Sequence, residues 1–266
     1  MDDNTLISSV PVSPKSFGPR QGVLLIIGML LASMFGSALV GFIWGIQASA
    51  LQAAHHVKPL HGLIKHLAAT MPSWLVAISA LSGSLLAAIW VFSYTLYAAG
   101  PYLQLGSAQD LAWRPSVAKG YGMAFILSMV ALSVVILTSI IVPPNPKHLI
   151  GPVEQLGKLP GLSHLAFIVI AVLIAPITEE LAFRGFLLAS LARKYSVATA
   201  VTISTLVFVA LHAPDKIHYW PGFIDVGVLA LFAAYVRLKY QSLRPAMFLH
   251  FCYNGSILLL AGLAHK

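Results

Sequence analysis

Long runs without charged residues constrain this chain most, because six of its stretches contain no Asp, Glu, Lys or Arg. They are residues 21–57, 66–109, 120–146, 159–178, 195–214 and 245–265. A helix needs about 20 apolar residues to span a bilayer, and it satisfies its own backbone hydrogen bonds there. A seventh segment, about residues 221–238, carries Asp225, and Gly100-Pro101 inside the second run could separate an eighth. The predicted fold class is all-α, a polytopic bundle of seven or eight transmembrane helices.

The composition agrees with a membrane protein. Hydrophobic residues make up 58% of the chain and charged residues 9%, whereas about a quarter of the residues of soluble domains are charged. The formal net charge is +8, but the basic residues are scattered through connecting loops, so we expect no nucleic-acid partner. With the N-terminus in the cytoplasm, slightly more basic residues fall on the cytoplasmic side of the membrane than on the other side. This modest bias predicts a multi-pass protein of the cell membrane with a cytoplasmic N-terminus. The sequence gives no signal for an oligomeric state.

The chain is organised as one continuous membrane domain with a short tail. Residues 1–20 form a polar N-terminal tail, residues 21–163 hold the N-terminal transmembrane helices and loops, and residues 164–266 bear the motifs. The segment Pro143-Pro144-Asn145-Pro146 is expected to end the third span, because proline cannot continue a helix. The first apolar run is long enough to remain in the bilayer as a helix and is not read as a cleaved signal.

Ionisable side chains within these runs mark the candidate site, because charges in hydrocarbon are costly unless they serve a function. Glu180 and Arg184 are one helical turn apart in the order that favours an ion pair. Glu179 points elsewhere on the helix and has no cation nearby, which makes it the better candidate for a general base. Pro176 is expected to kink the helix just before the two acids.

His212 is predicted to lie at the depth of Glu179. The two residues are about equally far from the link between their spans, residues 193–196, so an antiparallel hairpin would bring them level. A carboxylate and an imidazole at one level could hold a water molecule between them. The alternative is that His212, which precedes Ala213-Pro214, merely caps a span at the membrane interface.

The last span places His250 and Asn254 one turn apart on one face of an apolar helix. Both side chains could donate hydrogen bonds to an oxyanion, or they could only tie helices together. His250 lies about 9 Å of helix below Arg244, whereas Glu179 is over ~20 Å from its own turn. We therefore expect either that the hairpin projects from the bilayer or that its first helix breaks near Gly185.

Taken together, these residues match three motifs, Glu-Glu-x-x-x-Arg, Phe-x-x-x-His and His-x-x-x-Asn, in that order. The matching residues are Glu179, Glu180, Arg184, Phe208, His212, His250 and Asn254. Over about residues 164–258, the chain resembles the CAAX-protease and bacteriocin-processing (Abi) family. The resemblance implies an intramembrane glutamate protease of the type that removes the C-terminal tripeptide from prenylated proteins. The implied substrate is a membrane-bound peptide or a lipidated protein.

The resemblance also implies a role for each residue of the site. Glu179 and His212 would activate the attacking water, and His250 and Asn254 would stabilise the oxyanion. Glu180 and Arg184 would organise the site. No cofactor and no metal are implied, and the chain has no His-Glu-x-x-His arrangement for catalytic zinc.

Other interpretations remain open at this level. The protein could be a non-proteolytic membrane scaffold or a bacteriocin-immunity-type protein, or a proton-coupled transporter that uses its buried acids and histidines. Four histidines in residues 55–66 could chelate a metal, although their spacing matches no standard zinc pattern. Asp225 is expected near the interface or beside a cation, and Arg237 and Lys239 are expected to snorkel to the inner surface.

Overall fold

In the computed structural model, every regular element of the described residues is a helix, as predicted. The structure describes residues 18–54, 72–99, 110–145 and 160–264. The histidines of residues 55–66 and most of the predicted N-terminal tail lie outside these ranges. Gly100 and the rest of residues 100–109, where an eighth helix could be hidden, lie outside them too.

The first two described helices, α1 (Pro19–Ala54) and α3 (Ser73–Ala99), pack closely against each other. Glycine permits this approach, since a Cβ on Gly36 would lie 2.8 Å from the backbone oxygen of Ser82. Hydroxyls then bridge the two helices: Ser82 Oγ donates to Gly36 O at 2.8 Å, and Ser79 Oγ donates to Ser37 O at 3.0 Å. Small residues at a crossing are the usual way for membrane helices to pack, because the lipid provides no hydrophobic drive.

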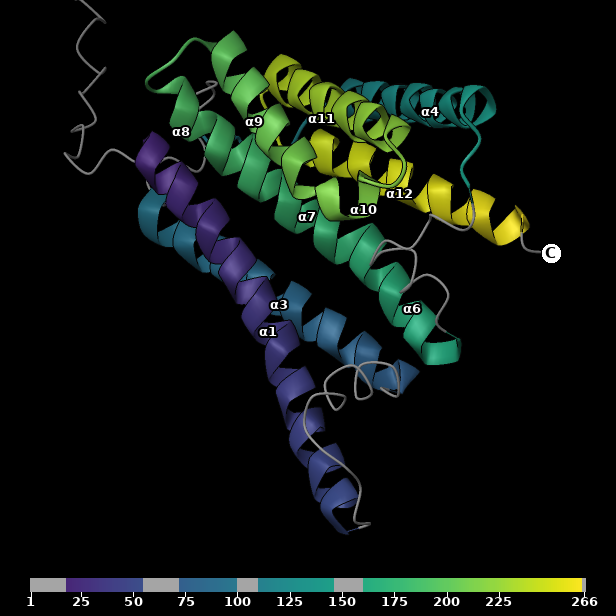
Figure 1. Ribbon diagram of the computed structural model, residues 1–266. Helices are drawn as coiled ribbons and strands as arrows, with labels where there is room; N and C mark the ends of the chain where they lie inside the picture. The colour runs from purple at the N-terminus through teal and green to yellow at the C-terminus, as the bar shows by residue number, and fades with distance from the viewer. Residues whose placement is uncertain (1–17, 55–71, 100–109, 146–159, 265–266) are drawn as a thin grey trace, which may run out of the picture.

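A long composite helix, residues 161–192, lies at the centre of the molecule (Figure 1). It begins with α6 (Gly161–Val169), widens into a π-helix, η3 (Ile170–Ile174), and continues as α7 (Ala175–Glu180). A second π-helix, η4 (Leu181–Leu187), follows and leads into α8 (Leu188–Ala192). A π-helical segment thus lies where the kink before the acids was predicted, and near Gly185, where one of the two alternatives placed a break, the helix continues through a second π-helical segment.

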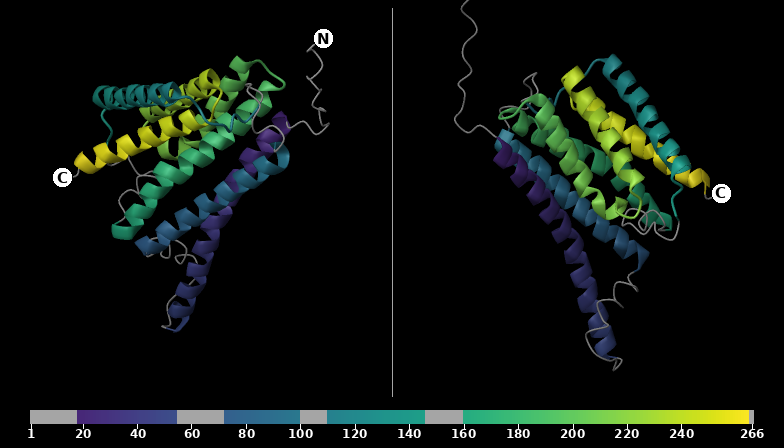
Figure 2. Two further views of the ribbon diagram at one scale, coloured as in Figure 1. Left: turned by 180° about the vertical axis from the view of Figure 1, so that it is seen from behind. Right: turned by 45° about the horizontal axis from the view of Figure 1, so that its top comes forward.

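The remaining helices lie on the side of the composite helix away from α1 and α3 (Figures 1 and 2). These are α4 (Ala118–Ile141), α9 (Val197–Leu211), the short α10 (Ala213–Lys216), α11 (Pro221–Tyr240) and α12 (Arg244–Ala264). As predicted, α4 ends just before the Pro143–Pro146 segment, and a turn over residues 193–196 joins α8 to α9.

Five helices of the described residues are long and apolar enough to cross a membrane. They are Pro19–Gln47, Ser73–Ala98, Ala118–Ile141, Gly161–Ala192 and Pro221–Tyr240. The fifth is the segment with Asp225 inside it. By contrast, α9 has only 15 residues, and α12 extends to the edge of the described chain. The total of seven or eight spans stays a prediction.

The expectation that Arg237 snorkels to the surface is wrong, because its side chain is fully buried. Its guanidinium lies 3.7 Å from a carboxylate oxygen of Asp110 and donates to the backbone oxygen of Asp110. Its Nε also donates to the backbone oxygen of Arg184 at 3.1 Å. A nearby carboxylate and two carbonyls thus replace the water that snorkelling would have reached.

Asp225 is also buried, and it accepts a hydrogen bond from Thr138 Oγ1 of α4 at 3.1 Å. The contact lies between two helices and accounts for a carboxylate in the middle of an apolar run. The acid therefore joins α11 to α4.

The different depths that the sequence suggested for Glu179 and His250 are reconciled by the position at which α12 begins. A Cβ on Gly185 would lie 3.3 Å from Leu243 Cδ2, so the start of α12 is level with the middle of η4. Glu179 lies six residues before Gly185 on the composite helix, and His250 lies seven residues after Leu243, which precedes α12. The hairpin therefore projects beyond the start of α12 by the end of η4 and α8, residues 186–192, and Glu179 and His250 come to the same level.

Candidate active site

The acidic pair lies at the junction between α7 and η4, so its two carboxylates have different surroundings. Glu180 is fully buried, whereas about 24% of the Glu179 side chain is exposed. Adjacent helical positions point about 100° apart, which directs the two side chains to different neighbours. The sequence-based division of roles between the acids agrees with this difference in burial.

One carboxylate oxygen of Glu180 holds two partners. Glu180 Oε1 accepts from Arg184 Nη1 at 3.0 Å, which is the predicted pair one turn apart, and from His250 Nδ1 at 2.9 Å. All three side chains are buried. Hydrogen bonds between ionised groups are strong in a dry interior, so this triad fixes the orientation of the His250 ring.

Two polar atoms of this triad have no hydrogen-bond partner among the described residues. They are Glu180 Oε2 and Arg184 Nη2, and both are fully buried. Leaving such groups unpaired costs free energy, which proteins tolerate mainly at functional sites. The pair therefore has hydrogen-bonding capacity for a ligand or for water.

Glu179 lies on the other side of the His250 ring. Its Oε2 is 4.0 Å from His250 Nε2, so the imidazole is placed between the two carboxylates. A separation of 4.0 Å is too long for a direct hydrogen bond, but one water molecule can contact both atoms. The structure therefore brings Glu179 and His250 together at a place that can hold water.

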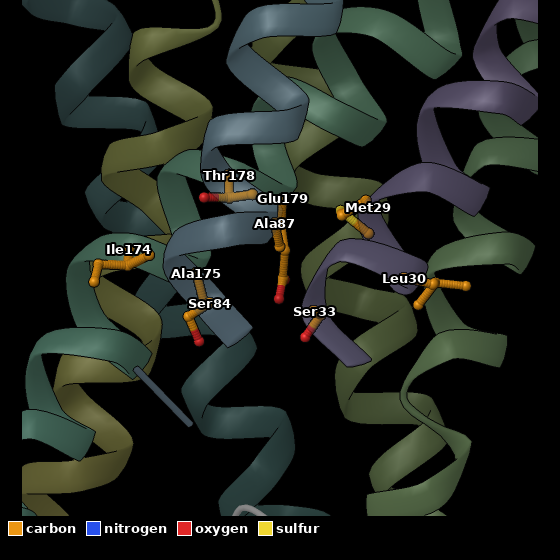
Figure 3. Close-up of a pocket in the computed structure, with 9 residues that line it drawn as sticks. All are labelled: Met29, Leu30, Ser33, Ser84, Ala87, Ile174, Ala175, Thr178 and Glu179. Carbon is orange, nitrogen blue, oxygen red and sulfur yellow. The ribbon is translucent and has the colours of Figure 1, made fainter. Parts of the chain in front are cut away.

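A cavity of about 160 Å³ opens beside Glu179, between α1, α3 and the composite helix (Figure 3). In Figure 3 the carboxylate of Glu179 points into this space, near the hydroxyls of Ser33 and Ser84. Thr178 and several apolar residues complete the lining: Met29, Leu30, Ala87, Ile174 and Ala175. A carboxylate inside the protein is thus accessible to a small polar or apolar group.

His212 is the C-cap of α9, whereas the position of this end at the membrane interface and a role of the ring in the site stay predictions. His212 Nδ1 lies 2.8 Å from the backbone oxygen of Phe208, so this nitrogen must be the donor. In the neutral ring, Nε2 then carries the lone pair, as a general base requires. The ring lies against Phe208, with centroids 4.5 Å apart.

Phe208 connects the three motifs, which the sequence analysis did not foresee. The Arg184 guanidinium lies 4.2 Å above its ring, and the rings of His212 and His250 lie 4.5 and 6.2 Å from it. Phe183 packs edge-on against it at 5.0 Å. An aromatic face attracts a cation, and its edges fix neighbouring rings. The only indication of this role in the sequence was the position of Phe208 four residues before His212.

The register of the predicted hairpin is supported by contacts of Phe183. Its ring contacts Phe208, and its backbone oxygen accepts from Ser204 Oγ at 3.1 Å. Phe183 therefore faces the turn of α9 between these two residues. One turn further down, Glu179 comes to the level of the end of α9, but its carboxylate points into the cavity beside α1 and α3, so a direct pairing with His212 stays a prediction. The imidazole that lies directly beside the Glu179 carboxylate, however, is that of His250.

Asn254 is placed differently from the other motif residues. Its Nδ2 donates to the backbone oxygen of Ala171 in η3 at 2.7 Å. This contact corresponds to the alternative in which the asparagine joins helices. Its contribution to an oxyanion site stays a prediction.

Metal-ligating groups do not cluster in the part of the chain that the structure describes. No set of three or more His, Cys, Asp or Glu side chains there could hold a metal ion. The arrangement instead offers two carboxylates and two imidazoles for proton transfer, and an arginine to balance their charge. The cavity and its serines come from α1 and α3, where sequence motifs gave no indication of a site.

Comparison with protein families matches residues 161–256 to the family described as "Type II CAAX prenyl endopeptidase Rce1-like". The matched segment begins with α6 and ends within α12, so it contains all three motifs. No curated protein and no solved structure matches the chain.

Proposed function

We propose that the chain is an intramembrane endopeptidase of the Rce1-like type that uses glutamate-activated water, and the match of residues 161–256 to that family supports the proposal. The observation that carries the proposal is the position of Glu179 at the edge of a cavity with His250 beside it, and with Glu180 and Arg184 behind His250. These groups could move protons and stabilise charge at one peptide bond.

In this proposal Glu179 removes a proton from the water, with His212 as its partner. Glu179 opens onto the cavity, and the Nε2 lone pair of His212 can accept a proton. The hydroxide adds to the peptide carbonyl and forms a tetrahedral intermediate. The proton then passes to the leaving amine, and the C–N bond breaks.

His250 is proposed to stabilise the intermediate. Its Nδ1–H is held by Glu180, so a proton on Nε2 would point towards the atoms reacting beside Glu179. A donor that is already oriented loses little free energy in reorganisation when the charge develops. Arg184 keeps Glu180 in place from the other side and is itself held over Phe208.

The proposed substrate is a peptide segment at the membrane, such as the C-terminus of a prenylated CAAX-type protein. The cavity reaches Glu179 from the side of α1 and α3, whose outward faces expose large apolar side chains such as Leu31 and Phe35. A lipidated chain end could approach such a surface from the bilayer. We place the protein in the cell membrane with a cytoplasmic N-terminus.

The proposal is tested with the purified protein in lipid nanodiscs and a fluorogenic peptide carrying a farnesylated CAAX end. Glu179→Gln and His212→Ala are each expected to lower kcat/KM by about 10²-fold or more. Lys239→Gln, at an exposed position, is the control and should leave the rate unchanged. Undiminished cleavage by both site variants would refute the proposal. The same peptide without its farnesyl group shows whether prenylation is required.

A further inference from the structure

The backbone oxygen of Ala171 lacks the partner that its helix would normally provide. At the end of η3 the backbone follows the π-helical register, in which an N–H bonds to the carbonyl five residues earlier, as Ala175 N does to Ile170 O. The next bond in this register would join residue 176 to Ala171. Residue 176 is proline, which has no N–H to donate. Pro176 therefore leaves the Ala171 carbonyl open within a membrane helix.

Asn254 supplies the missing donor from another helix. Its Nδ2 lies 2.7 Å from Ala171 O, and α12 passes close by, since a Cβ on the next residue, Gly255, would lie 3.9 Å from Val172 Cγ1. An unpaired backbone carbonyl in hydrocarbon costs several kcal/mol. The hydrogen bond between Asn254 and Ala171 therefore stabilises the packing of α12 against the composite helix.

The same face of α12 holds the composite helix at a second point. One turn before Asn254, His250 bonds Glu180 at 2.9 Å. The two contacts lie on either side of Glu179 along the composite helix. We propose that Asn254 is a positioning residue: it takes the place of the missing Pro176 N–H and thereby keeps α12 in the register that sets His250 beside Glu179.

This inference adds a positioning role to the one that the family resemblance implies for Asn254. An amide nitrogen has two hydrogens, and one of them is directed at Ala171 O. The effect of this bond on catalysis acts through the position of His250, and it is separate from any contact that the second hydrogen makes with the substrate. The consequence for activity rests on the proposed function, whereas the consequence for helix packing does not.

Four proteins form the test: the wild type, Asn254→Ala, Pro176→Ala and the double variant, each in nanodiscs. Pro176→Ala restores an N–H in the helix, which can bond Ala171 O and make the asparagine dispensable. Thermal unfolding and the separate values of kcat and KM for the farnesylated peptide are measured for each. Asn254→Gln, which keeps the amide, serves as the conservative variant.

We expect the effect of Asn254→Ala to depend strongly on whether residue 176 is proline or alanine. With Pro176 present, Asn254→Ala should lower Tm and reduce kcat by up to about 10²-fold, as a misplacement near 1 Å does. In the Pro176→Ala background both losses should shrink by at least half, and Asn254→Gln should recover part of kcat. KM should change little throughout.

Equal losses of kcat in both backgrounds, with Tm unchanged, would overturn the proposal and assign Asn254 to the oxyanion. Equal losses of Tm in both backgrounds would overturn it as well, because the two positions would then act independently. If none of the proteins cleaves the peptide, the proposed function fails. The coupling in Tm still decides the positioning role in that case.

Discussion

Two neighbouring glutamates differ in what they contribute, because one is enclosed and the other faces a cavity. Glu180 balances Arg184 and orients His250 from a fully buried position. Glu179 makes a longer contact, 4.0 Å to His250, and lines the cavity. At the scale of single residues, the proposed function thus assigns chemistry to Glu179, whereas the contacts of Glu180 assign it a structural role.

Removing the charge of each glutamate is expected to separate these two effects. Glu179→Gln should abolish most activity, by about 10²-fold or more, with little change in Tm. Glu180→Gln should lower both, because it leaves the buried Arg184 without its counter-ion, at a cost of about 3 kcal/mol or more. Activity and thermal unfolding of the two variants side by side check this. Similar loss of Tm in both would contradict the assignment.

Phe208 offers a second test at this scale. Phe208→Leu keeps an apolar side chain but removes the ring face under Arg184, worth about 2 kcal/mol when desolvated. We expect lower Tm and lower kcat, because Arg184 and both imidazoles lose a common support. The control is Phe125→Leu on the exposed surface of α4, which should behave as the wild type. Wild-type values for Phe208→Leu would argue against the connecting role of this ring.

At the scale of elements, the two π-helical segments and the α1–α3 pair shape the site. The segments η3 and η4 flank the turn with the acids, and each widening rotates the side chains that follow it. The helices α1 and α3 provide the opposite wall of the cavity. That wall depends on the crossing of α1 and α3, where the two helix backbones are in close contact.

Enlarging a glycine at this crossing is expected to displace the wall. Gly36→Ala puts a Cβ 2.8 Å from Ser82 O and should destabilise the protein by about 1–3 kcal/mol, with a loss of activity. Gly41→Ala, on the same helix with nothing within 4 Å, should be neutral or slightly stabilising, since alanine favours helix. Thermal unfolding of the pair measures the difference. Equal Tm values would mean that the crossing tolerates expansion.

At the scale of the whole molecule, a buried network joins segments that are far apart in sequence. Arg237 of α11 contacts Asp110 and the backbone of Arg184, and Leu243 N donates to Ala112 O at 2.9 Å. These contacts tie the segment before α4, the composite helix and the start of α12 together. The level at which α12 begins, and hence the depth of His250, depends on them.

Breaking this network is expected to unfold the site from a distance. Arg237→Met leaves Asp110 buried without its guanidinium partner and should cost about 3 kcal/mol or more. Arg244→Met, at an exposed position seven residues later, is the control and should have little effect. Chemical denaturation compares their free energies of unfolding. A stability loss that is the same for both would contradict the network's role.

Much of the fold could be predicted from sequence, because the bilayer requires helices and the apolar runs show where they lie. The pairing of Glu180 with Arg184 followed from helical spacing alone. The partners of His250, Asn254 and Arg237 could not be predicted in this way, since each comes from a helix distant in sequence. The burial of Arg237 was missed because its partner, Asp110, lies in a connecting loop.

The sequence by itself determined the helical class, the motif-bearing segment and the candidate site residues, because lipid excludes unpaired polar groups and each one is therefore easy to identify. Tertiary structure alone decided which of these groups meet. The start of α12 level with Gly185 and the two π-helical widenings set the depth and rotation of each side chain. Periodicity along one helix fixes directions on that helix, whereas the meeting of two helices depends on contacts between them.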